Sequence, residues 1–350
     1  MELVRRGNRG VVLHAVHDLR VEDLPMPELR RHEVLVEIKV VGICASDVHF
    51  YDWGSVGPFI PGGPLVLGHE PVGTVVDRAE GATKHEIGTR VALEPGVPCG
   101  RCRQCRLGRY NLCPEVEFLG TWPRDGALAR YVAMHEDFVH PVPDALSDES
   151  AALVEPLAVA LWATTKAGVA PGRHVLVSGA GPIGLLCLQV ARAAGATVVA
   201  VTDVRDSALE RAGRLGASQT INVGKQSLSE LWTEPDILLE CSGDARALEE
   251  GVAALALGGV GVLVGVGPET ATMPIATIRR RELTVTAIFR YRNVFPAAVE
   301  LAASGRIDLE GLVTDRYTLE TAPEAFAAAI HATTGEDTGR VKALVYVGSD

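Results

Sequence analysis

Apolar and polar positions divide the chain into a part rich in short strands and a part in which strands and helices alternate. In the first part, residues 34–41 combine alternation with β-branched side chains, and segments 73–76, 90–93 and 131–132 have the same character. Turn-forming sequences such as Pro-Gly-Gly-Pro at 61–64 separate such segments. The pattern predicts a β-rich N-terminal part that ends near residue 150.

The pattern changes at Ser147, which two acidic residues follow, as is typical of a helix N-cap and first turn. An Ala- and Leu-rich helix then runs toward Gly168, with a kink expected at Pro156. Beyond it we predict, in turn, strand 174–179, helix 183–194, strand 197–203, helix 207–215, strand 236–241, helix 245–257 and strand 260–267. This alternation indicates an α/β fold with a doubly wound parallel sheet.

The last part of the chain contains a predicted strand at 283–289, a helix at 295–304 and a final strand at 341–347. A tail of this length cannot easily form a large core of its own. We therefore expect it to pack back on the N-terminal part. A chain of 350 residues is itself typical of two domains.

Charge and composition exclude several classes of partner. Lys and Arg number 33 against 44 Asp and Glu, a net charge of −11, so neither a nucleic acid nor an anionic membrane is expected to bind. Residues 1–10 contain basic side chains but no apolar segment behind them, and the uncharged stretch 251–268 holds six glycines and is typical of a buried strand. We expect a soluble cytoplasmic protein whose partner is a small molecule.

Four of the seven cysteines lie close together, in the pattern Cys99-x2-Cys102-x2-Cys105-x7-Cys113. Four thiolates at this spacing can surround one tetrahedral Zn²⁺ and close its coordination shell, so a structural zinc is predicted. Unrelated thiols and an iron–sulfur cluster are the alternatives. Cys187 and Cys241 fall in predicted buried elements and are interpreted as core residues.

A glycine-rich turn follows the strand at 174–179 and opens the next helix, with Gly179, Gly181 and Gly184 in the GxGxxG pattern. Asp203 ends the following strand, as the dinucleotide-binding fingerprint requires. The carboxylate of Asp203 is expected to accept hydrogen bonds from the ribose hydroxyls of NAD and to repel the 2′-phosphate of NADP. The positive charge of Arg205 leaves NADP as the alternative cofactor. The alternative interpretation of the three glycines is an ordinary tight turn that binds no nucleotide.

A second, open zinc site is suggested by residues that are far apart in the sequence. Cys44 begins the segment Cys-Ala-Ser-Asp-x-His, and His69 and Glu70 follow a short apolar run. Together with Glu155 they offer thiolate, imidazole and carboxylate ligands, which suit a catalytic Zn²⁺ that keeps one exchangeable position. Taken separately, Cys44 has an ordinary interpretation as a small buried residue. His69 has one as a histidine whose hydrogen bonds are made within the protein.

At this point the sequence resembles a known family. The pattern Gly68-His69-Glu70-x2-Gly73-x5-Ala79 is similar to the signature of the zinc-containing medium-chain alcohol dehydrogenases. The segments GICASDVHFY, ALEPGVPC, GRYNLCP, LVEPLAVA and FRYRN resemble the sorbitol/xylitol (polyol) dehydrogenase branch. The resemblance implies a GroES-like catalytic domain at 1–152, a Rossmann NAD-binding domain at 153–290, a return to the catalytic domain at 291–350, and a homotetramer.

The resemblance also implies roles for individual residues. Cys44, His69 and Glu70 would hold the catalytic zinc, Glu155 would bind the metal or hold its water, and Asp47 would orient His69. Ser46 would take the proton of the alcohol and pass it toward His49. The expected substrate contacts are Ser46, Tyr51, Phe118, Thr121, Arg290 and Tyr291. The expected cofactor contacts are Gly179, Gly181, Pro182, Ile183, Gly184, Asp203, Arg205, Ser242, Val264, Gly265, Phe289 and Arg290.

The function expected from these features is the zinc-dependent transfer of a hydride from a secondary alcohol of a polyol to NAD, which gives a ketose, with two zinc ions per chain. Ala45 and the pair Phe50-Tyr51 depart from the usual polyol pattern and leave the substrate open. Threonine, an aldonate such as idonate, or a simple alcohol are the other substrates to consider. A non-enzymatic relative would be expected to lack Cys44, His69 or Glu155, and all are present.

Overall fold

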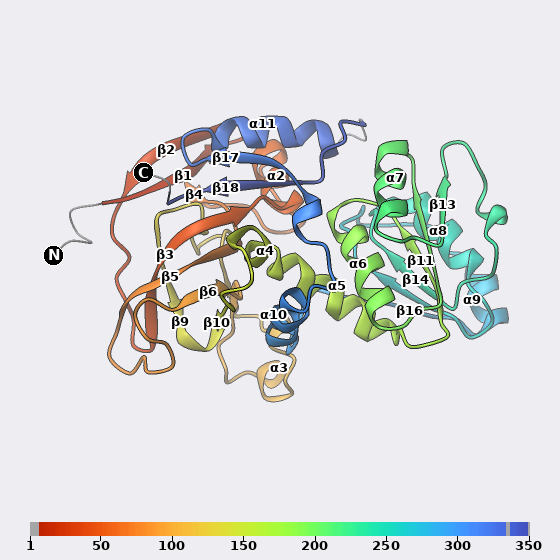
Figure 1. Cartoon of the computed structure of the whole chain (residues 1–350), viewed down its shortest axis with the longest axis horizontal. Helices are drawn as coiled ribbons and strands as arrows, with labels where there is room; N and C mark the ends of the chain where they lie inside the picture. Colours follow the sequence, from red (N-terminus) through yellow and green to blue (C-terminus); the bar gives the residue numbers. More distant parts are fainter. Residues whose placement is uncertain (1–6, 334–336, 349–350) are drawn as a thin grey trace.

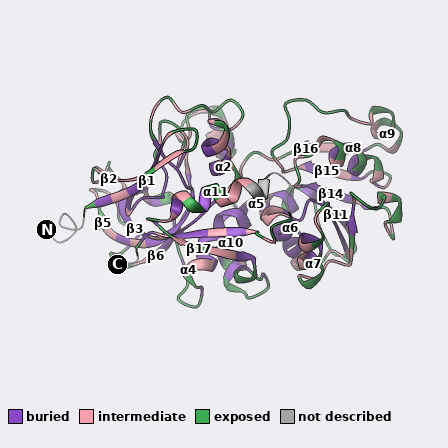
Figure 2. Ribbon diagram, turned by 90° about the horizontal axis from the view of Figure 1, so that it is seen from above, coloured by how far each residue is buried: buried purple, intermediate pink, exposed green. Residues whose placement is uncertain are grey.

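The computed structural model describes residues 7–333 and 337–348. Two parts lie side by side, a largely antiparallel β part that holds the N-terminal strands and a parallel α/β part, with the helix α5 (Val154–Ala167) between them (Figure 1). Buried residues concentrate along the strands of both parts, while the connecting loops are mostly exposed (Figure 2).

The central sheet of the β part runs in the order β10-β6-β5-β3-β18-β17, and β9 also pairs with β3. Val34, Val36 and Ile38 of β3 are completely buried, as expected for the alternating segment at 34–41. The strands of this sheet are β3 (Glu33–Gly42), β5 (Glu70–Arg78), β6 (Arg90–Leu93), β9 (Tyr131–His135), β10 (Val139–Pro141), β17 (Val313–Thr318) and β18 (Lys342–Tyr346).

Smaller strands complete the β part. A sheet in the order β2-β1-β4 consists of β1 (Asn8–Ala15), β2 (Asp18–Leu24) and β4 (Leu65–Val66). A short ribbon joins β7 (Gly96–Val97) to β8 (Glu117–Phe118). The first two strands did not stand out in the sequence, because both alternate weakly and β2 carries four charged residues.

The C-terminal segment returns to the β part, as predicted for the tail. β18 pairs antiparallel with β3, and β17 extends the sheet beyond β18. In Figure 1 the blue C-terminal elements lie beside the red and orange N-terminal strands. The physical reason is that the end of β3 at Val40 and Val41 is apolar and buried on both faces, so its backbone groups need a partner strand at this edge.

The α/β part is a parallel sheet in the order β13-β12-β11-β14-β15-β16. This is the doubly wound order of a dinucleotide-binding domain, and it confirms the predicted fold class. Its strands are β11 (His174–Ser178), β12 (Val198–Asp203), β13 (Gln219–Asn222), β14 (Ile237–Glu240), β15 (Val260–Leu263) and β16 (Thr284–Ala287). β13 was missed, since its four residues are polar at three positions.

The α-helices connect the strands and cover the sheets. They are α2 (Ala45–Trp53), α3 (Arg103–Arg106), α4 (Asp148–Ala152), α5, α6 (Pro182–Ala193), α7 (Asp206–Arg214), α8 (Ala245–Ala254), α9 (Ile275–Arg281), α10 (Phe295–Ala303) and α11 (Ala322–Thr333). Single 3₁₀ turns occur at Tyr110–Leu112, Glu136–Phe138, Leu228–Glu230 and Glu310–Leu312. No helix in the described ranges is both long and apolar enough to cross a membrane.

The predicted helix after Ser147 is interrupted earlier than expected. The Ser147 side chain accepts a hydrogen bond from the Ser150 amide and caps α4, as predicted. The break falls at Leu153, between α4 and α5, and Pro156 lies in the first turn of α5 instead of kinking a continuous helix. Proline is tolerated in a first turn, because the amide that it lacks has no partner within the helix there.

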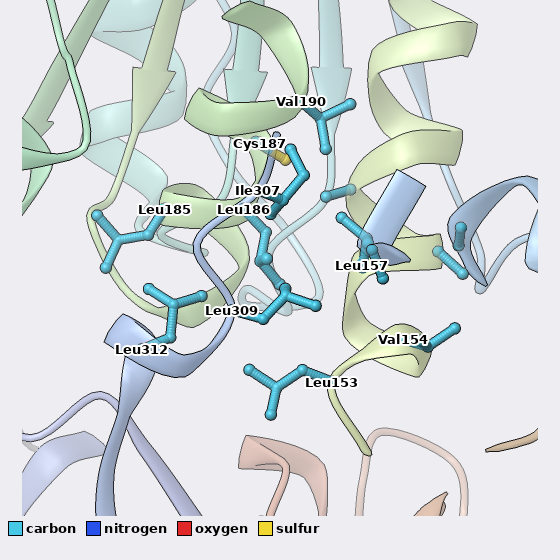
Figure 3. Packing of buried hydrophobic residues seen from close by; sticks show 14 of the residues in the cluster. Leu153, Val154, Leu157, Leu185, Leu186, Cys187, Val190, Ile307, Leu309 and Leu312 are labelled. Atoms are coloured by element: carbon cyan, nitrogen blue, oxygen red, sulfur yellow. The ribbon is translucent and has the colours of Figure 1, made fainter. Parts of the chain in front are cut away.

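A shared core joins the two parts. Figure 3 shows Leu153 and Leu157 facing Leu186 of α6, with Leu309 and Leu312 of the returning chain closing the cluster. Each of these leucines is at most 2% exposed, and such burial contributes about 1.5–3 kcal/mol per side chain. The core therefore fixes α5, which starts at the boundary, relative to both sheets.

Candidate active site and cofactor-binding site

The N-terminus of α2 brings a thiol, a carboxylate and an imidazole together. Cys44 is the N-cap residue of α2, and its amide donates to Oδ2 of Asp47 at 3.0 Å. Oδ1 of Asp47 accepts the amide of Gly68 at 3.1 Å and lies 3.3 Å from Nδ1 of His69. Asp47 is 1% exposed, so it fixes the imidazole of His69 in one orientation from within the core.

Negative charge dominates the surroundings of His69. Burial opposes a charged imidazole, but Asp47 and the Cys44 thiol outweigh it and raise the pKa of His69 well above its ordinary value. The aromatic ring of Phe118 lies 5.5 Å from the His69 ring and shields it from one side. A site that stabilises positive charge this strongly suits a bound cation.

Glu70 is completely enclosed and is held by a lysine from the other end of the chain. The Glu70 side chain is 1% exposed, and its Oε1 accepts a hydrogen bond from Nζ of Lys342 at 2.6 Å. Burial opposes the charge of Lys342, yet Glu70 and the Cys44 thiol raise its pKa above the ordinary value. The pair is therefore a buried carboxylate–ammonium contact beside the cysteine and the histidine.

Glu155 enters the same region from the first turn of α5. It is 6% exposed, and burial raises the pKa of its carboxyl to about 7, with the nearby Glu70 acting in the same direction. Burial raises the pKa of Tyr291, which is 4% exposed, and the field of Glu155 acts in the same direction. The predicted long-range approach of residue 155 to residues 69 and 70 is thus present in the fold.

The donor set fits a zinc ion. Within the described residues, the ligand atoms of Cys44, His69 and Glu70 all lie within 4.8 Å of one another. Glu155 is close enough to feel the charges of His69 and Glu70 but is not a member of that tight group. A thiolate, an imidazole and a carboxylate, with a further carboxylate nearby, are the ligands of a catalytic zinc that keeps an open position.

Phe118 and Arg290, two residues of the predicted substrate pocket, lie beside this cluster. Arg290 has a positive φ of 56°, and its guanidinium lies 4.0 Å from the centre of the Phe118 ring. Burial lowers the pKa of Arg290 to about 10. Thr121 follows Phe118 in a tight turn, where its amide donates to the Phe118 carbonyl at 3.0 Å. Ser46 lies in the first turn of α2 and is half-buried.

Two residues predicted on α2 lie in different surroundings. The His49 ring stacks on Trp53 at 4.1 Å, and its half-buried position lowers the pKa of the imidazole. The Tyr51 ring instead packs edge-on against Phe326 of α11 at 5.6 Å and is 8% exposed. Tyr51 therefore packs in the core of the β part, because residues two positions apart on an α-helix, such as His49 and Tyr51, point about 200° apart around its axis.

The four-cysteine lobe, residues 99–113, is a separate metal-binding candidate. Sγ atoms of Cys99, Cys102, Cys105 and Cys113 also lie within 4.8 Å of one another. The Cys102 and Cys105 sulfurs are 3.4 Å apart, and amide donors of Arg101 and Cys102 lower the pKa of the Cys99 thiol to about 7. Four convergent thiols that form no disulfide fit a closed zinc site.

The lobe also contacts the segment that contains Arg290. Nδ2 of Asn111 donates to the Phe289 carbonyl at 2.8 Å, and the Tyr110 hydroxyl accepts the Asn293 amide at 2.7 Å. The same hydroxyl donates to the buried Glu94 at 2.7 Å. The lobe thus supports the backbone on both sides of Arg290.

The glycine-rich turn has the geometry of a dinucleotide-binding loop. Gly179 has a φ of +91°, and a Cβ there would lie 2.9 Å from Ser242. Gly181 is the N-cap of α6 and Pro182 opens the helix, which Ile183 continues. A Cβ at Gly184 would lie 1.8 Å from the Gly179 carbonyl oxygen, so only glycine allows this close contact.

Asp203 lies at the end of β12 directly beside this turn. Its Oδ2 accepts the amide of Ala180 at 2.7 Å and a guanidinium hydrogen of Arg205 at 3.2 Å. Its Oδ1 accepts the backbone amide and Nε of Arg205, at 2.9 and 3.0 Å. Burial opposes ionisation, but Arg205 outweighs it and holds the pKa of Asp203 below its usual range.

The remaining expected cofactor contacts lie along the same edge of the parallel sheet. Ser242 follows β14, and its amide donates to Glu240 at 2.8 Å. Val264 and Gly265 follow β15, and their amides donate to the Glu240 carbonyl at 2.8 and 2.9 Å. Phe289 follows β16 and is 46% exposed. All four residues therefore follow the carboxyl ends of parallel strands, where such sheets bind ligands.

Comparison with protein families identifies both parts of the chain. Residues 30–144 match the model of the alcohol dehydrogenase GroES-like domain, and residues 182–304 match that of the zinc-binding dehydrogenases. The sorbitol dehydrogenase of Bacillus subtilis is 39% identical over 93% of this chain and 95% of its own length. The chain belongs to the zinc-containing medium-chain alcohol dehydrogenase family.

Further relatives agree with this assignment. The sorbitol dehydrogenase of Gallus gallus is 43% identical over 91% of this chain and 92% of its own length. The structure of L-idonate 5-dehydrogenase from Escherichia coli has a TM-score of 0.90 and 29% identity, and covers 97% of this chain and 98% of its own. The predicted family, the GroES-like and Rossmann architecture, and the class of zinc- and NAD-dependent oxidoreductase are confirmed.

Sequence reasoning missed some residues of this zinc dehydrogenase. Lys342 was not considered, although it shares a strand face with the buried Leu344, and a lysine on an apolar face is a usable signal. Tyr110 and Asn111 lie in one of the motifs of the polyol branch, but nothing in their spacing showed that they contact residues 289–293. Contacts over such a separation can be read only from the folded chain.

Proposed function

We propose that this dehydrogenase oxidises a secondary alcohol of a polyol, of the sorbitol or xylitol type, to a ketose with NAD as the hydride acceptor. The observation that carries the proposal is the buried cluster of Cys44, His69 and Glu70, with Glu155 nearby, beside a pocket lined by Phe118 and Arg290. The identity to sorbitol dehydrogenases over nearly the whole chain supports the substrate class.

The residues around the metal position have distinct roles in this proposal. Zinc bound there supplies Lewis acidity that lowers the pKa of an alcohol. The Ser46 hydroxyl, on the first turn of α2, takes the proton of the alcohol and passes it toward His49, since His49 is half-buried and its lowered pKa keeps it neutral. Asp47 keeps the His69 ring in place throughout.

Polar and aromatic side chains next to the metal position explain why a polyol is the expected substrate. The Arg290 guanidinium lies over Phe118, and its Nη1 is buried without a hydrogen-bond partner. Buried donors without partners are costly, so a ligand rich in hydroxyl groups that satisfies them gains affinity. Thr121, three residues after Phe118, is a further hydroxyl that we expect to contact the substrate.

The Rossmann part positions the cofactor. NAD, when bound, would supply the hydride acceptor. The backbone of Gly179–Gly184 would hold its pyrophosphate at the N-terminus of α6, and the Asp203 carboxylate would accept hydrogen bonds from the hydroxyls of the adenosine ribose. Phe289 and Arg290 follow β16, and the Arg290 guanidinium contacts the rings of both Phe289 and Phe118. The second zinc, in the four-cysteine lobe, has a structural role in this proposal.

A homotetramer and a cytoplasmic location belong to the proposal as well. The similarity to the polyol branch supports the tetramer. Light scattering of the purified protein tests the first. A monomer at micromolar concentration would contradict it.

A substrate panel tests the proposed activity. The initial rates of NAD reduction with sorbitol, xylitol, ribitol, idonate and threonine should give the highest kcat/KM for one of the polyols. The structural similarity to L-idonate 5-dehydrogenase makes an aldonate the second candidate. A preference for idonate would select that candidate, and no turnover with any member of the panel would refute the proposed substrate class.

A further inference from the structure

A contact between the two parts of the chain lies beside the cofactor-binding turn. Oδ2 of Asp337, in the segment that leads from α11 to β18, accepts the amide of Ser207 at 3.2 Å, and Oδ1 accepts the hydroxyl of the same serine. Two nitrogens of the Arg211 guanidinium lie 3.2 Å from the Gly339 carbonyl. In Figure 1 the blue chain that leads into β18 passes close to α7. The β part therefore places a carboxylate on the first turn of a helix of the α/β part.

The first turn of α7 lacks a cap of its own. Arg205 is the N-cap residue, and its side chain forms no cap hydrogen bond. Amides at the N-terminus of a helix have no partner within the helix, and they attract negative charge. Asp337 supplies this charge, although 130 residues separate it from Ser207. The anion position at the start of α7 is thus filled by a carboxylate of the protein itself.

This position adjoins the carboxylate that is expected to hold the adenosine ribose. The hydrogen bonds to Asp203 raise the pKa of Arg205, and the field of Asp337 acts in the same direction. Hydrogen bonds from Ser207 hold the pKa of Asp337 below its ordinary value, and the charge of Arg205 adds to this effect. Both carboxylates are therefore ionised at neutral pH, and both act on the same guanidinium.

The two nicotinamide cofactors differ in charge at this end of the molecule. NAD has neutral ribose hydroxyls, whereas the 2′-phosphate of NADP carries up to about two negative charges. Rossmann folds that accept this phosphate do so with an arginine near the end of the second strand. Here Arg205 already faces Asp203 and Asp337, and the donors of Ser207 are taken. A neutral hydroxyl adds no charge to this group, but a phosphate does.

We propose that Asp337 is a specificity-determining residue that the β part contributes to the cofactor site, where its negative charge excludes the 2′-phosphate of NADP. The exclusion is additional to that expected from Asp203, because the second carboxylate comes from the other part of the chain. The inference rests on the cofactor site and not on the polyol substrate. Without the charge of Asp337, NADP should bind more tightly and NAD as before.

Binding of the reduced cofactors tests the inference without any substrate. NADH and NADPH differ only in the 2′-phosphate, and the change in their fluorescence on binding gives both Kd values. Asp337→Asn keeps an acceptor oxygen for Ser207 and removes the charge, so the Kd for NADPH should fall about fivefold. The Kd for NADH should change by less than about twofold. At about 1 M salt the gain in NADPH affinity should shrink, because such salt screens exposed charges beyond about 3 Å.

Two matched variants separate the charge of Asp337 from its contacts. Asp337→Glu keeps the charge and should keep the weak binding of NADPH. Arg211→Ala removes the other contact of this segment with α7 but leaves the hydrogen bonds between Asp337 and Ser207, so the ratio of the two Kd values should not change. If Asp337→Glu bound NADPH as tightly as Asp337→Asn, the charge would not be the cause.

Two results for Asp337→Asn would overturn the proposal. An unchanged ratio of the Kd values for NADPH and NADH would mean that Asp337 takes no part in cofactor selection. A parallel rise of both Kd values would mean that Asp337 only stabilises the start of α7. Failure of the unchanged protein to bind NADH would instead refute the cofactor site itself, whatever the substrate.

Discussion

The two candidate zinc sites differ in how much of the chain each one needs. The four-cysteine lobe draws all its ligands from residues 99–113, and three of its four cysteines are partly exposed. The catalytic cluster draws on β5, the N-terminus of α2 and the start of α5, and Lys342 joins it from β18. The first site requires a loop, whereas the second requires the assembled fold.

The difference in charge is equally large. The lobe surrounds its metal position with four thiols and places Arg101, Arg103 and Arg106 close by in the sequence. The catalytic cluster combines different ligand types, with Asp47 fixing the imidazole and Lys342 fixing a carboxylate. A closed set of four identical ligands favours a permanently bound metal ion. A mixed set with a surplus carboxylate favours a metal ion that keeps one exchangeable ligand position.

The largest expected effect comes from Cys44→Ala. Turnover should fall by at least about 10³-fold, because the Lewis acidity at the site contributes several kcal/mol of transition-state stabilisation. Elemental analysis should show the loss of one zinc while the zinc of the lobe remains. A protein that contains one zinc before and after the substitution would mean that the catalytic cluster does not bind metal.

Cys102→Ser should mainly affect stability. Metal binding to such a lobe contributes folding free energy, and its loss should lower Tm on the order of 5–10 °C. The value of kcat for the folded fraction should change by less than about threefold, while KM for the substrate rises because the lobe supports the backbone beside Arg290. Calorimetry and steady-state kinetics measure both. An unchanged Tm with collapsed kcat would reverse the two sites' roles.

Glu155→Gln sharpens the comparison within the catalytic cluster. It keeps the shape of the side chain and removes its charge, so kcat should fall at least about tenfold, roughly 1.4 kcal/mol of barrier. Zinc content or the pH profile should change with it. Normal turnover, zinc content and pH profile together would show that Glu155 only occupies the first turn of α5.

Arg205→Ala tests the cofactor site at the glycine-rich turn. Like the four-cysteine lobe, this turn is formed by residues that lie close together in the sequence. Four hydrogen bonds already reach the carboxylate of Asp203, three of them from Arg205, so a ribose must displace this arginine. NAD should be preferred over NADP in the unchanged protein. The variant should raise that preference about tenfold, or 1.4 kcal/mol, since the only nearby partner predicted for a 2′-phosphate is removed.

The control for this experiment is Arg211→Ala on the same helix, whose guanidinium contacts the Gly339 carbonyl at 3.2 Å instead of Asp203. The ratio of kcat/KM for the two cofactors should not change in it. If the ratio of kcat/KM for NAD and NADP were the same in Arg205→Ala and in the unchanged protein, Arg205 would not contribute to the choice between the two cofactors.

His49→Gln should have the smallest effect. Only neutral His49 can accept the proton from Ser46, so activity is full above its pKa and is lost as pH falls through it. Burial lowers that pKa, so the acid limb should lie below about pH 6.5, the ordinary value for histidine. The variant should lose this limb and a few-fold in kcat. If the acid limb stays in place, another group accepts the proton.

The sequence by itself determined the elements whose signals are local. Alternating apolar positions predicted β3 and most strands of the parallel sheet, and the spacing of Gly179, Gly181 and Gly184 predicted a turn that only glycine can form. The spacing of the four cysteines predicted their convergence. In each case the interacting atoms are separated by few residues, so short-range geometry is sufficient.

The tertiary structure alone decided how distant residues meet. It brought Lys342 to Glu70 through the register of β18 on β3, turned Tyr51 into the core against Phe326, and set the lobe beside residues 289–293. The ends of α4 and α5 were also decided by packing at the boundary between the two parts. A sequence pattern fixes which side chains share a face of one element, but only the packing of elements fixes which faces are opposed, because that choice depends on the apolar surface of the whole chain.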